Sequence, residues 1–185
     1  MLTVSPDLDA RFRGAALAEG LVDVRYDVLE SPIGDLLAAQ TDRGLTRISF
    51  HADAFEDTLA RTYGVRVLRA PLDDVRRELD EYFEGRRRDF DLPIDWALAS
   101  AFGRRVLKAT AAIPFGQVST YGAVALRAGN PKASRAAGRA LGANPIPIVV
   151  PCHRVIGAGG RLTGYTGGLH RKVALLEIEG VVLPG

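Results

Sequence analysis

The chain has 185 residues, 47% hydrophobic and 25% charged, a composition typical of soluble globular proteins. No run approaches the roughly 20 apolar residues of a membrane-spanning helix, and the N-terminal stretch lacks the apolar segment of a signal peptide. The single cysteine excludes an internal disulfide, which suits a cytoplasmic protein, and it excludes a multi-cysteine zinc site. We expect no metal and no cofactor.

The formal net charge of +2 conceals two halves of opposite sign. Residues 1–95 hold 13 Lys+Arg and 20 Asp+Glu, a net charge of −7, whereas residues 96–185 hold 11 and 2, a net charge of +9. Such segregation favours two domains, the second of which faces a polyanion such as nucleic acid. The alternative is that the two halves simply attract each other.

The first half predicts a sheet behind an N-terminal extension. Residues 1–20 form that extension, with a short helix around Ala10–Ala18. Three strand-like runs follow at Val22–Leu29, Leu36–Thr41 and Leu45–Phe50, separated by the turn sequences SPIG and DRG. Their close spacing predicts an antiparallel meander.

Two helices and a link complete this half. Residues 53–64 and 71–85 have helical spacing, and a proline-containing link follows at 86–95. The second helix has an apolar stripe typical of a packed core, formed by Leu72, Val75, Leu79, Tyr82 and Phe83. Because no nucleophiles, metal ligands or phosphate-binding loops gather here, residues 21–92 are predicted to be a scaffold domain.

Residues 96–185 are predicted to be a second, mostly helical domain. Its first helix spans about Ser100–Ala112 and ends at the sequence IPFGQ. A short helix then begins after a side-chain cap at Ser119 or Thr120 and reaches Ala128.

The GNP turn that follows predicts the start of a recognition helix. Asn130 is a favourable N-cap residue, and Pro131 suits the first helical position, where the missing N–H has no consequence. This helix is expected to run from Pro131 to Leu141. Together with the short helix before it, it predicts a helix-turn-helix.

The predicted recognition helix is basic but otherwise poor in bulky side chains. Its charged residues are Lys132, Arg135 and Arg139. A helix with ordinary side chains is about 10–12 Å across and the minor groove about 6 Å wide, so small residues allow a closer approach to DNA. Few of its side chains could recognise base edges, so we expect DNA binding that is largely independent of sequence. The alternative is a tightly packed internal helix.

The sequence NPIPIVVPCHRVIG, 144–157, contains the only thiol, Cys152, next to His153. The apolar run 146–150 is predicted to be extended and to end in a rigid arm at Pro151. A thiol with a pKa of about 8.5 is only a few per cent thiolate at neutral pH, so it needs a base, and His153 is the candidate. Consecutive residues on an extended chain point to opposite faces, so a bridging water is expected. The alternative is a buried structural cysteine.

The C-terminal segment GGLHRKVALLEIEG predicts a last helix with Leu169, Val173 and Leu176 on one stripe. Glu179 falls in its last turn, where the helix dipole disfavours a carboxylate. Glu179 therefore either points to solvent or is held by a cationic or hydrogen-bonding partner, a role for which His153 is suited.

Several of these segments resemble one family. PCHRVIG at 151–157, GNPKASRAAG at 129–138, NPIPI at 144–148 and GYTGG at 164–168 are similar to motifs of the O6-alkylguanine-DNA alkyltransferases, also called methylated-DNA–protein-cysteine methyltransferases. The resemblance is dense over residues 102–180 and loose over the first half. It implies an α+β fold, in which a ribonuclease-H-like antiparallel sheet domain precedes a winged-helix-like domain with the helix-turn-helix.

The resemblance implies direct repair of O6-alkylguanine, and of O4-alkylthymine, in double-stranded DNA. A base inside a duplex cannot be attacked at O6, so it is expected to be flipped out at a cost of a few kcal/mol. Cys152 would take the alkyl group as a thioether, which has no ordinary reductive route back, so each molecule would act once. A monomer with no membrane partner is implied, and cooperative binding along DNA is left open.

The resemblance assigns the chemical steps to five residues. Cys152 would be the acceptor thiolate, and His153 would deprotonate it through a water. Glu179 would hold the imidazole, and Asn144 would brace the turn between the recognition helix and the active-site segment. Tyr121 would rotate the 3′ phosphate and donate a proton toward guanine N3, so that the base leaves without full negative charge.

The other implied contacts are to DNA and to the flipped base. Arg135 would enter the base stack in place of the flipped nucleotide. Further DNA contacts are implied for Tyr121, Asn130, Lys132, Ser134, Ala136 and Gly138. The backbone carbonyls of Cys152 and Val155 would accept from the exocyclic amine of guanine. The loop over the base would contain Tyr165, Thr166 and Gly167.

Three other functions compete with this one. A thiol hydrolase that uses Cys152 and His153 would turn over repeatedly, but it leaves the basic helix-turn-helix unexplained. The second is a non-catalytic DNA-binding protein that recognises alkylated bases or regulates transcription. Alkyltransferase-like proteins of this kind lack the acceptor cysteine, which is present here. A methyltransferase with a soluble methyl donor needs a glycine-rich strand-to-helix loop, and GAGG at 157–160 does not follow such a strand.

Overall fold

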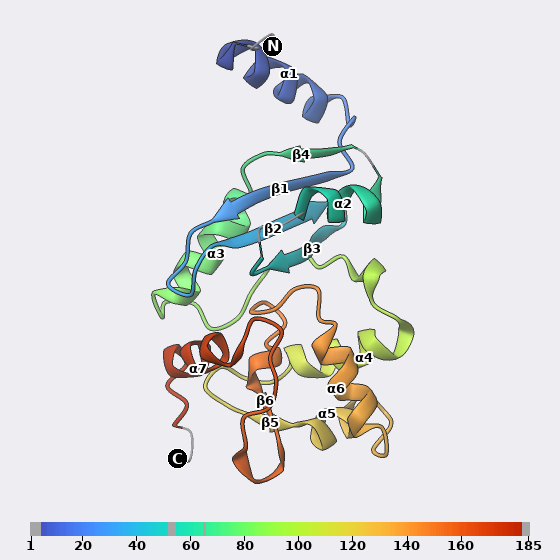
Figure 1. The fold of residues 1–185 in the computed structure, drawn as a ribbon, viewed down its shortest axis with the longest axis vertical. Helices are drawn as coiled ribbons and strands as arrows, with labels where there is room; N and C mark the ends of the chain where they lie inside the picture. The colour runs from blue at the N-terminus through green and yellow to red at the C-terminus, as the bar shows by residue number, and fades with distance from the viewer. Residues whose placement is uncertain (1–4, 52–54, 65, 183–185) are drawn as a thin grey trace.

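The computed structural model describes residues 5–51, 55–64 and 66–182. A sheet domain and a helical domain are stacked along the long axis of the molecule, and helix α1 projects from the sheet domain at the far end (Figure 1). Within the described ranges, no helix is long and apolar enough to cross a membrane.

Helix α1, Pro6–Ala18, begins earlier than predicted. The reason is a side-chain cap, because the Ser5 hydroxyl accepts a hydrogen bond from the backbone N–H of Leu8 at 3.3 Å. Arg13 attaches the helix to the sheet by donating to the carbonyl oxygen of Arg69 at 2.9 Å.

The predicted antiparallel meander is confirmed. It consists of β1, Val24–Leu29, β2, Leu36–Thr41, and β3, Gly44–Ser49. A fourth strand, β4, Val67–Arg69, is absent from the predicted elements and pairs parallel with β1, which gives the order β3-β2-β1-β4. Three residues are too few to show the two-residue alternation by which a strand is found in a sequence.

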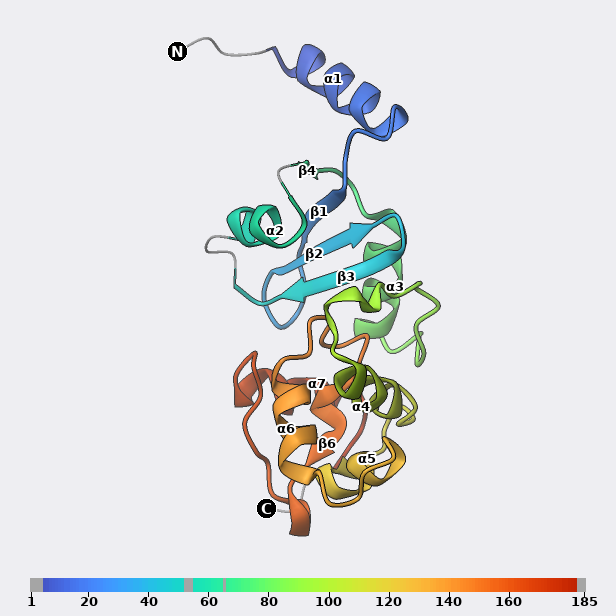
Figure 2. The same cartoon turned by 90° about the vertical axis from the view of Figure 1, so that its right-hand side faces the viewer.

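Helices α2, Phe55–Tyr63, and α3, Asp73–Phe83, cover opposite faces of the sheet (Figure 2). Successive side chains of a strand point to opposite faces, so Leu37 belongs to the cluster with α2 and Leu36 to the larger core with α3. Both helices were expected, although residues 53–54 of the first prediction lie outside the described residues.

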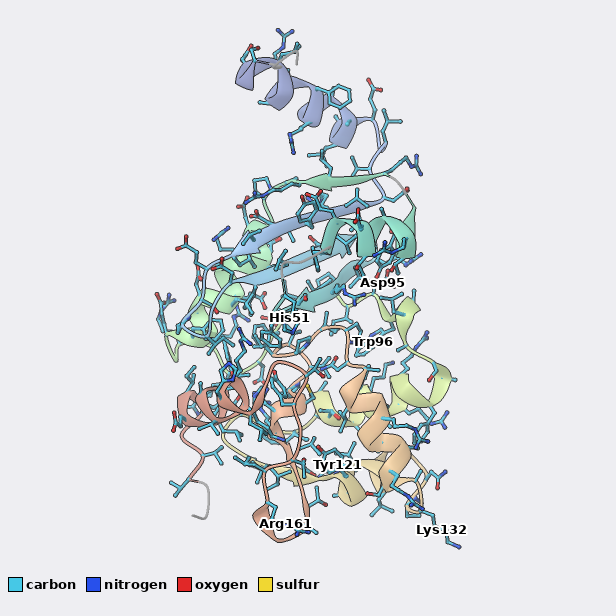
Figure 3. The ribbon with its side chains drawn as sticks, in the orientation of Figure 1. His51, Asp95, Trp96, Tyr121, Lys132 and Arg161 are labelled. Carbon is cyan, nitrogen blue, oxygen red and sulfur yellow. The ribbon has the colours of Figure 1, made fainter. Side chains whose placement is uncertain are left out.

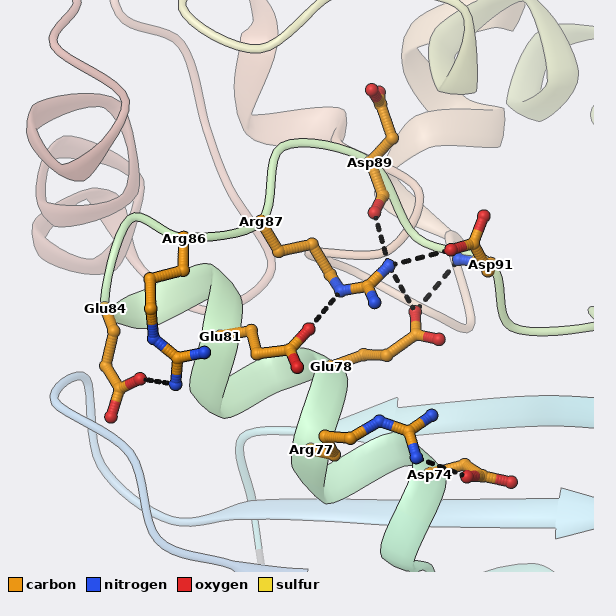
Figure 4. A network of polar contacts seen from close by, with 9 residues as sticks. All are labelled: Asp74, Arg77, Glu78, Glu81, Glu84, Arg86, Arg87, Asp89 and Asp91. Atoms are coloured by element: carbon orange, nitrogen blue, oxygen red, sulfur yellow. Dashed lines mark hydrogen bonds and ion pairs between the residues drawn. The ribbon is translucent and has the colours of Figure 1, made fainter.

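Charged side chains fix the start of the link between the domains (Figure 4). Arg87 donates to Glu81 at 2.8 Å and to Asp91 at 3.0 Å. The buried carboxylate of Glu78 accepts from the backbone N–H of Asp91 at 2.9 Å. These contacts hold residues 87–91 on α3, so the start of the link belongs to the packed surface of the first domain.

Helices and two very short strands build the second domain. The helices are α4, Ala101–Ala111, α5, Tyr121–Arg127, α6, Ser134–Gly142, and α7, Leu169–Ile178. The strands are β5, Ser119–Thr120, and β6, Val155–Ile156, which pair in parallel. Single 3-10 turns are η1, Trp96–Leu98, η2, Cys152–Arg154, and η3, Ala158–Gly160.

Helices α5 and α6 occur as predicted, except at the start of α6. Thr120 caps α5 by accepting from the N–H of Ala123 at 3.2 Å. Asn130 does not cap α6. Its carbonyl oxygen instead accepts from the N–H of Ala133 at 3.0 Å and closes a turn. The fixed φ of Pro131 suits the second position of such a turn as well as a helix start, which is why the prediction was wrong here.

Candidate active site and nucleic-acid interface

The chain reaches the cysteine through a tight turn, so the prediction of an extended run over 146–150 is wrong. The N–H of Val150 donates to the carbonyl oxygen of Ile146 at 2.9 Å, and Ile148 has a φ of 75°. A β-branched residue rarely adopts this left-handed conformation. Because the Ile146 and Ile148 side chains are completely buried, core packing holds the turn in place.

Cys152 is the first residue of η2, not a residue of an extended arm. It is only 9% exposed. The Nδ2 group of Asn144 donates to Sγ of Cys152 at 3.2 Å and to the carbonyl oxygen of Val150 at 2.9 Å. Its Oδ1 accepts from the N–H of Ile146 at 3.1 Å, so Asn144 connects the tight turn to the thiol.

His153 is completely buried, and its Nε2 lies 2.8 Å from Oε1 of Glu179. Since an ionised carboxylate only accepts hydrogen bonds, Nε2 carries the proton and Nδ1 keeps a free lone pair. Nδ1 is buried and has no hydrogen-bond partner among the described residues. Within the described residues, His153 therefore makes no direct hydrogen bond to Cys152. This agrees with the prediction, but its reason was wrong, because the two residues lie in a 3-10 turn and not on an extended chain.

Glu179 is buried at the C-terminal end of α7, held by donors rather than pointing to solvent. Arg154 donates to its carboxylate from Nε and Nη2, both at 2.9 Å. The hydroxyl of Tyr82 donates at 2.8 Å and the backbone N–H of Gly116 at 3.2 Å. The sequence pointed to His153 as the partner but did not identify Arg154 or Tyr82.

The pKa values of Glu179 and His153 follow from their burial and their contacts. Burial alone would raise the pKa of Glu179, but hydrogen bonds from His153 and Arg154 outweigh burial and lower the pKa to about 2. Burial lowers the pKa of His153 despite its bond to Glu179. At neutral pH the pair therefore consists of a carboxylate and a neutral imidazole.

Burial and neighbouring groups act in opposite directions on the pKa of the thiol, and burial prevails. Burial raises the pKa of Cys152, while the hydrogen bond from Asn144 and the charge of Lys172 act in the opposite direction. Lys172 is completely buried on α7, and its Nζ donates to the carbonyl oxygen of Val155 at 2.7 Å. At rest the thiol is protonated, so it needs a base before it can react.

The segment predicted to cover the base packs on the first domain. The ring of Tyr165 lies 5.9 Å from the ring of Phe50, and its hydroxyl is buried without a hydrogen-bond partner among the described residues. Gly167 lies so close to the ring of Phe50 that a Cβ on it would be 2.7 Å from that ring. Thr166 is exposed and donates to the carbonyl oxygen of Gly142 at 2.9 Å.

Helix α6 presents basic side chains to solvent. Arg135 and Arg139 are exposed along it, as are Asn130 and Lys132 in the turn before it. Lys132 lies at the end of the molecule opposite α1 (Figure 3). The small residues predicted to contact DNA are half-buried: Ser134, Ala136 and Gly138.

The small residues of α6 also serve packing inside the domain. Ala137 is completely buried, and a Cβ on Gly138 would lie 3.6 Å from the ring of Tyr121. One side of this helix is therefore packed inside the domain, while its basic side chains face solvent. The Tyr121 hydroxyl shares a 2.7 Å hydrogen bond with Thr163, so Tyr121 lies outside the Cys152 network.

The chain matches two domains of one family. Residues 24–96 match the ribonuclease-like domain of 6-O-methylguanine DNA methyltransferase, and residues 101–181 match its DNA-binding domain. The methylated-DNA–protein-cysteine methyltransferase of Mycolicibacterium paratuberculosis is 45% identical over 156 residues, which cover 84% of this chain and 92% of the relative.

The chain belongs to the 6-O-methylguanine DNA methyltransferase family. Among solved members, the O6-methylguanine methyltransferase of Mycobacterium tuberculosis is 42% identical with a TM-score of 0.74, covering 84% of this chain and 92% of that one. The OGT protein of the same organism in complex with DNA is 40% identical with a TM-score of 0.75, covering 84% and 93%. The predicted family and α+β fold are confirmed.

Proposed function

We propose that this chain repairs O6-alkylguanine in double-stranded DNA by moving the alkyl group to Cys152, once per molecule. The observation that carries the proposal is the buried thiol next in sequence to a neutral imidazole whose Nε2–H is bonded to Glu179 and whose Nδ1 has no partner among the described residues. The imidazole can serve as a base for the thiol, and the thioether that forms has no ordinary route back to the thiol.

The proposed chemistry begins with the thiol proton. A water between Sγ of Cys152 and Nδ1 of His153 relays the proton to the imidazole, and Glu179 stabilises the imidazolium. The thiolate attacks the alkyl carbon, so that an S–C bond forms while the C–O6 bond breaks. Tyr121 donates a proton toward guanine N3, and the base leaves neutral. The thiol has then become a thioether. The imidazolium of His153 gives up the thiol proton to solvent and the Tyr121 phenolate takes one up, so that the net change moves one proton from sulfur to the base.

Access to O6 is proposed to require base flipping. Exposed Arg135 on α6 would fill the gap in the stack, while Asn130, Lys132 and the half-buried α6 residues contact the backbone. The carbonyl of Val155 already accepts one hydrogen bond from Lys172 and has a second lone pair for the exocyclic amine. The Tyr165 hydroxyl has no partner in the part of the chain that the structure describes, which supports a role for its loop against the flipped base.

Several finer points belong to the same proposal. Residues 21–92 act as scaffold and residues 96–185 as the DNA-binding, alkyl-accepting domain, with 1–20 as an extension. We expect O4-alkylthymine to be a second substrate. We also expect a cytoplasmic monomer. It should bind duplex DNA largely without sequence preference, because α6 offers few side chains that recognise base edges.

The fate of the methyl group tests the proposal. After incubation with a duplex that contains one O6-methylguanine, the intact mass of the protein should increase by one CH2, located on the peptide with Cys152. Product should not exceed one equivalent of protein at any excess of DNA. Repaired DNA together with an unmodified protein would instead indicate a turnover enzyme such as a hydrolase.

Arg135→Ala should separate flipping from chemistry. Because Arg135 is exposed and makes no contact with the Cys152 network, the variant should react with free O6-methylguanine base within about twofold of the parent. On a duplex its rate should fall about tenfold or more, because nothing replaces the flipped nucleotide. Lys132→Ala is the matched control, as it removes a charge without the proposed insertion. Equal losses of Arg135→Ala on both substrates would exclude a flipping role.

A further inference from the structure

One buried hydrogen bond joins the first domain directly to the candidate active site. Tyr82, on α3, is completely buried, and its hydroxyl donates to Oε1 of Glu179 at 2.8 Å. The two residues are 97 positions apart in the chain. The phenol ring is fixed by aromatic neighbours, with ring centroids 5.3 Å from Phe83, 5.4 Å from Phe90 and 6.1 Å from Phe115. The hydroxyl therefore has little freedom to leave the carboxylate.

Tyr82 and His153 bond to the same oxygen atom. His153 Nε2 lies 2.8 Å from Oε1, and Tyr82 Oη lies 2.8 Å from it. The other donors to this carboxylate, Arg154 and the N–H of Gly116, belong to the second domain. Among the described residues, Tyr82 is thus the contribution of the first domain to the group that orients the imidazole.

Chemistry favours a permanent donor here. Burial, followed by the charge of Glu179, raises the pKa of Tyr82 well above its ordinary value, so the phenol is protonated at neutral pH and remains a donor. A hydrogen bond to a charged group contributes more free energy than one between neutral groups. A buried carboxylate that loses a donor is therefore less well stabilised in its ionised form. Glu179 also sits at the C-terminal end of α7, where the helix dipole disfavours its charge and adds to its need for donors.

We infer that Tyr82 is a positioning residue through which the first domain sets the orientation of Glu179, hence of His153, and so the reactivity of the Cys152 thiol. The inference rests on the proposed function. The first domain would then take part in the chemistry through one hydroxyl, which completes the set of hydrogen-bond donors to the Glu179 carboxylate.

Tyr82→Phe removes the hydroxyl and keeps the ring in its aromatic cluster. The second-order rate of methyl transfer should fall about tenfold, the effect of losing one charge-assisted hydrogen bond. The loss should be the same on free O6-methylguanine base and on the duplex, because the change lies in the acceptor and not in DNA binding. DNA affinity should match that of the parent.

The pH profile distinguishes positioning from a general loss of structure. Four groups around the imidazole set its charge: Glu179, Arg154, Lys172 and, through Glu179, Tyr82. A carboxylate with one donor fewer keeps more of its negative charge and favours the imidazolium, so the acidic limb of the rate profile should move to higher pH. Tyr63→Phe is the matched control, because it removes another bonded hydroxyl of the first domain, the partner of Thr46, from a ring that packs against the other cluster of the sheet. Its rate and profile should be those of the parent.

A double-mutant cycle keeps the inference testable if Tyr82→Phe is also less stable. In a Glu179→Gln background, Tyr82→Phe should cause no further loss of rate, since its effect passes through that carboxylate. Additive losses, an unchanged pH profile, or a loss confined to the duplex would each overturn the inference. A parent protein that never gains a methyl group would instead refute the proposed function itself.

Discussion

Cys152→Ser should abolish methyl transfer, by at least about a thousandfold, and leave the affinity for duplex DNA within about twofold of the parent. A serine oxygen is smaller than sulfur, so it fits the same space, and it can accept a hydrogen bond from the Asn144 amide that now donates to Sγ at 3.2 Å. Its pKa, however, is too high for a neutral imidazole to ionise it. The variant thus keeps the fold and the α6 surface while it loses the nucleophile.

Two measurements check this outcome. Gel-shift titration of duplex DNA reports binding, and intact mass after incubation with O6-methylguanine DNA reports transfer. Loss of both binding and transfer would mean that the thiol is a structural part of the core. Transfer that persists in the serine variant would place the acceptor on another residue.

Glu179→Gln should have the second largest effect, on rate and on stability together. The amide group of glutamine is a hydrogen-bond donor, and it would face donors from Arg154, Gly116 or His153. Arg154 would also be left buried without its counter-charge, which typically costs about 3–5 kcal/mol. Without the carboxylate the imidazole loses both its fixed tautomer and its charge partner, so transfer should slow about a hundredfold or more.

Acid unfolding gives this prediction a second readout. The folded-state pKa of Glu179 is about 2 and its ordinary value 4.5, so the unfolded chain takes up the proton first as the pH falls. The stability that the carboxylate contributes is therefore present above pH 4.5 and lost between pH 4.5 and about 2, on the order of 3 kcal/mol. Denaturant unfolding at a series of pH values should show this loss in the parent and not in Glu179→Gln.

His153 adds to the acid sensitivity with the same sign. Its folded-state pKa lies below the ordinary 6.5 because of burial, so protonation favours the unfolded chain below that pH. The loss of stability should therefore begin below pH 6.5 in both proteins. Glu179→Gln with the full pH dependence of the parent would show that the carboxylate is not the group that titrates.

Local signals in the sequence were sufficient for much of this molecule. Thr120 caps α5 as its side chain predicted, and the buried stripe of α3 follows from its helical spacing. The segment PCHRVIG pointed to the thiol and to the imidazole beside it. These features depend on residues a few positions apart, so the physical causes are contained in short segments.

Tertiary contacts decided the rest. On α7, Leu169 belongs to the predicted apolar stripe but is 46% exposed. Lys172 is completely buried, where its ammonium group donates a hydrogen bond to the carbonyl of Val155. Nothing near a lysine in sequence reveals such a partner. The short strands β4 and β5 exist only because their partners lie beside them, since a strand of two or three residues has no stability alone.

The sequence by itself determined the family, the α+β fold and the position of the one thiol beside an imidazole. Only the tertiary structure decided how that imidazole is held, because the carboxylate of Glu179 gathers donors from Tyr82, Gly116 and the η2 turn. In the sequence Tyr82 belongs to an apolar stripe, and its hydroxyl gains a role only when the two domains pack together. A buried charge is stabilised by whichever dipoles the fold brings to it, and spacing along the chain does not encode those positions.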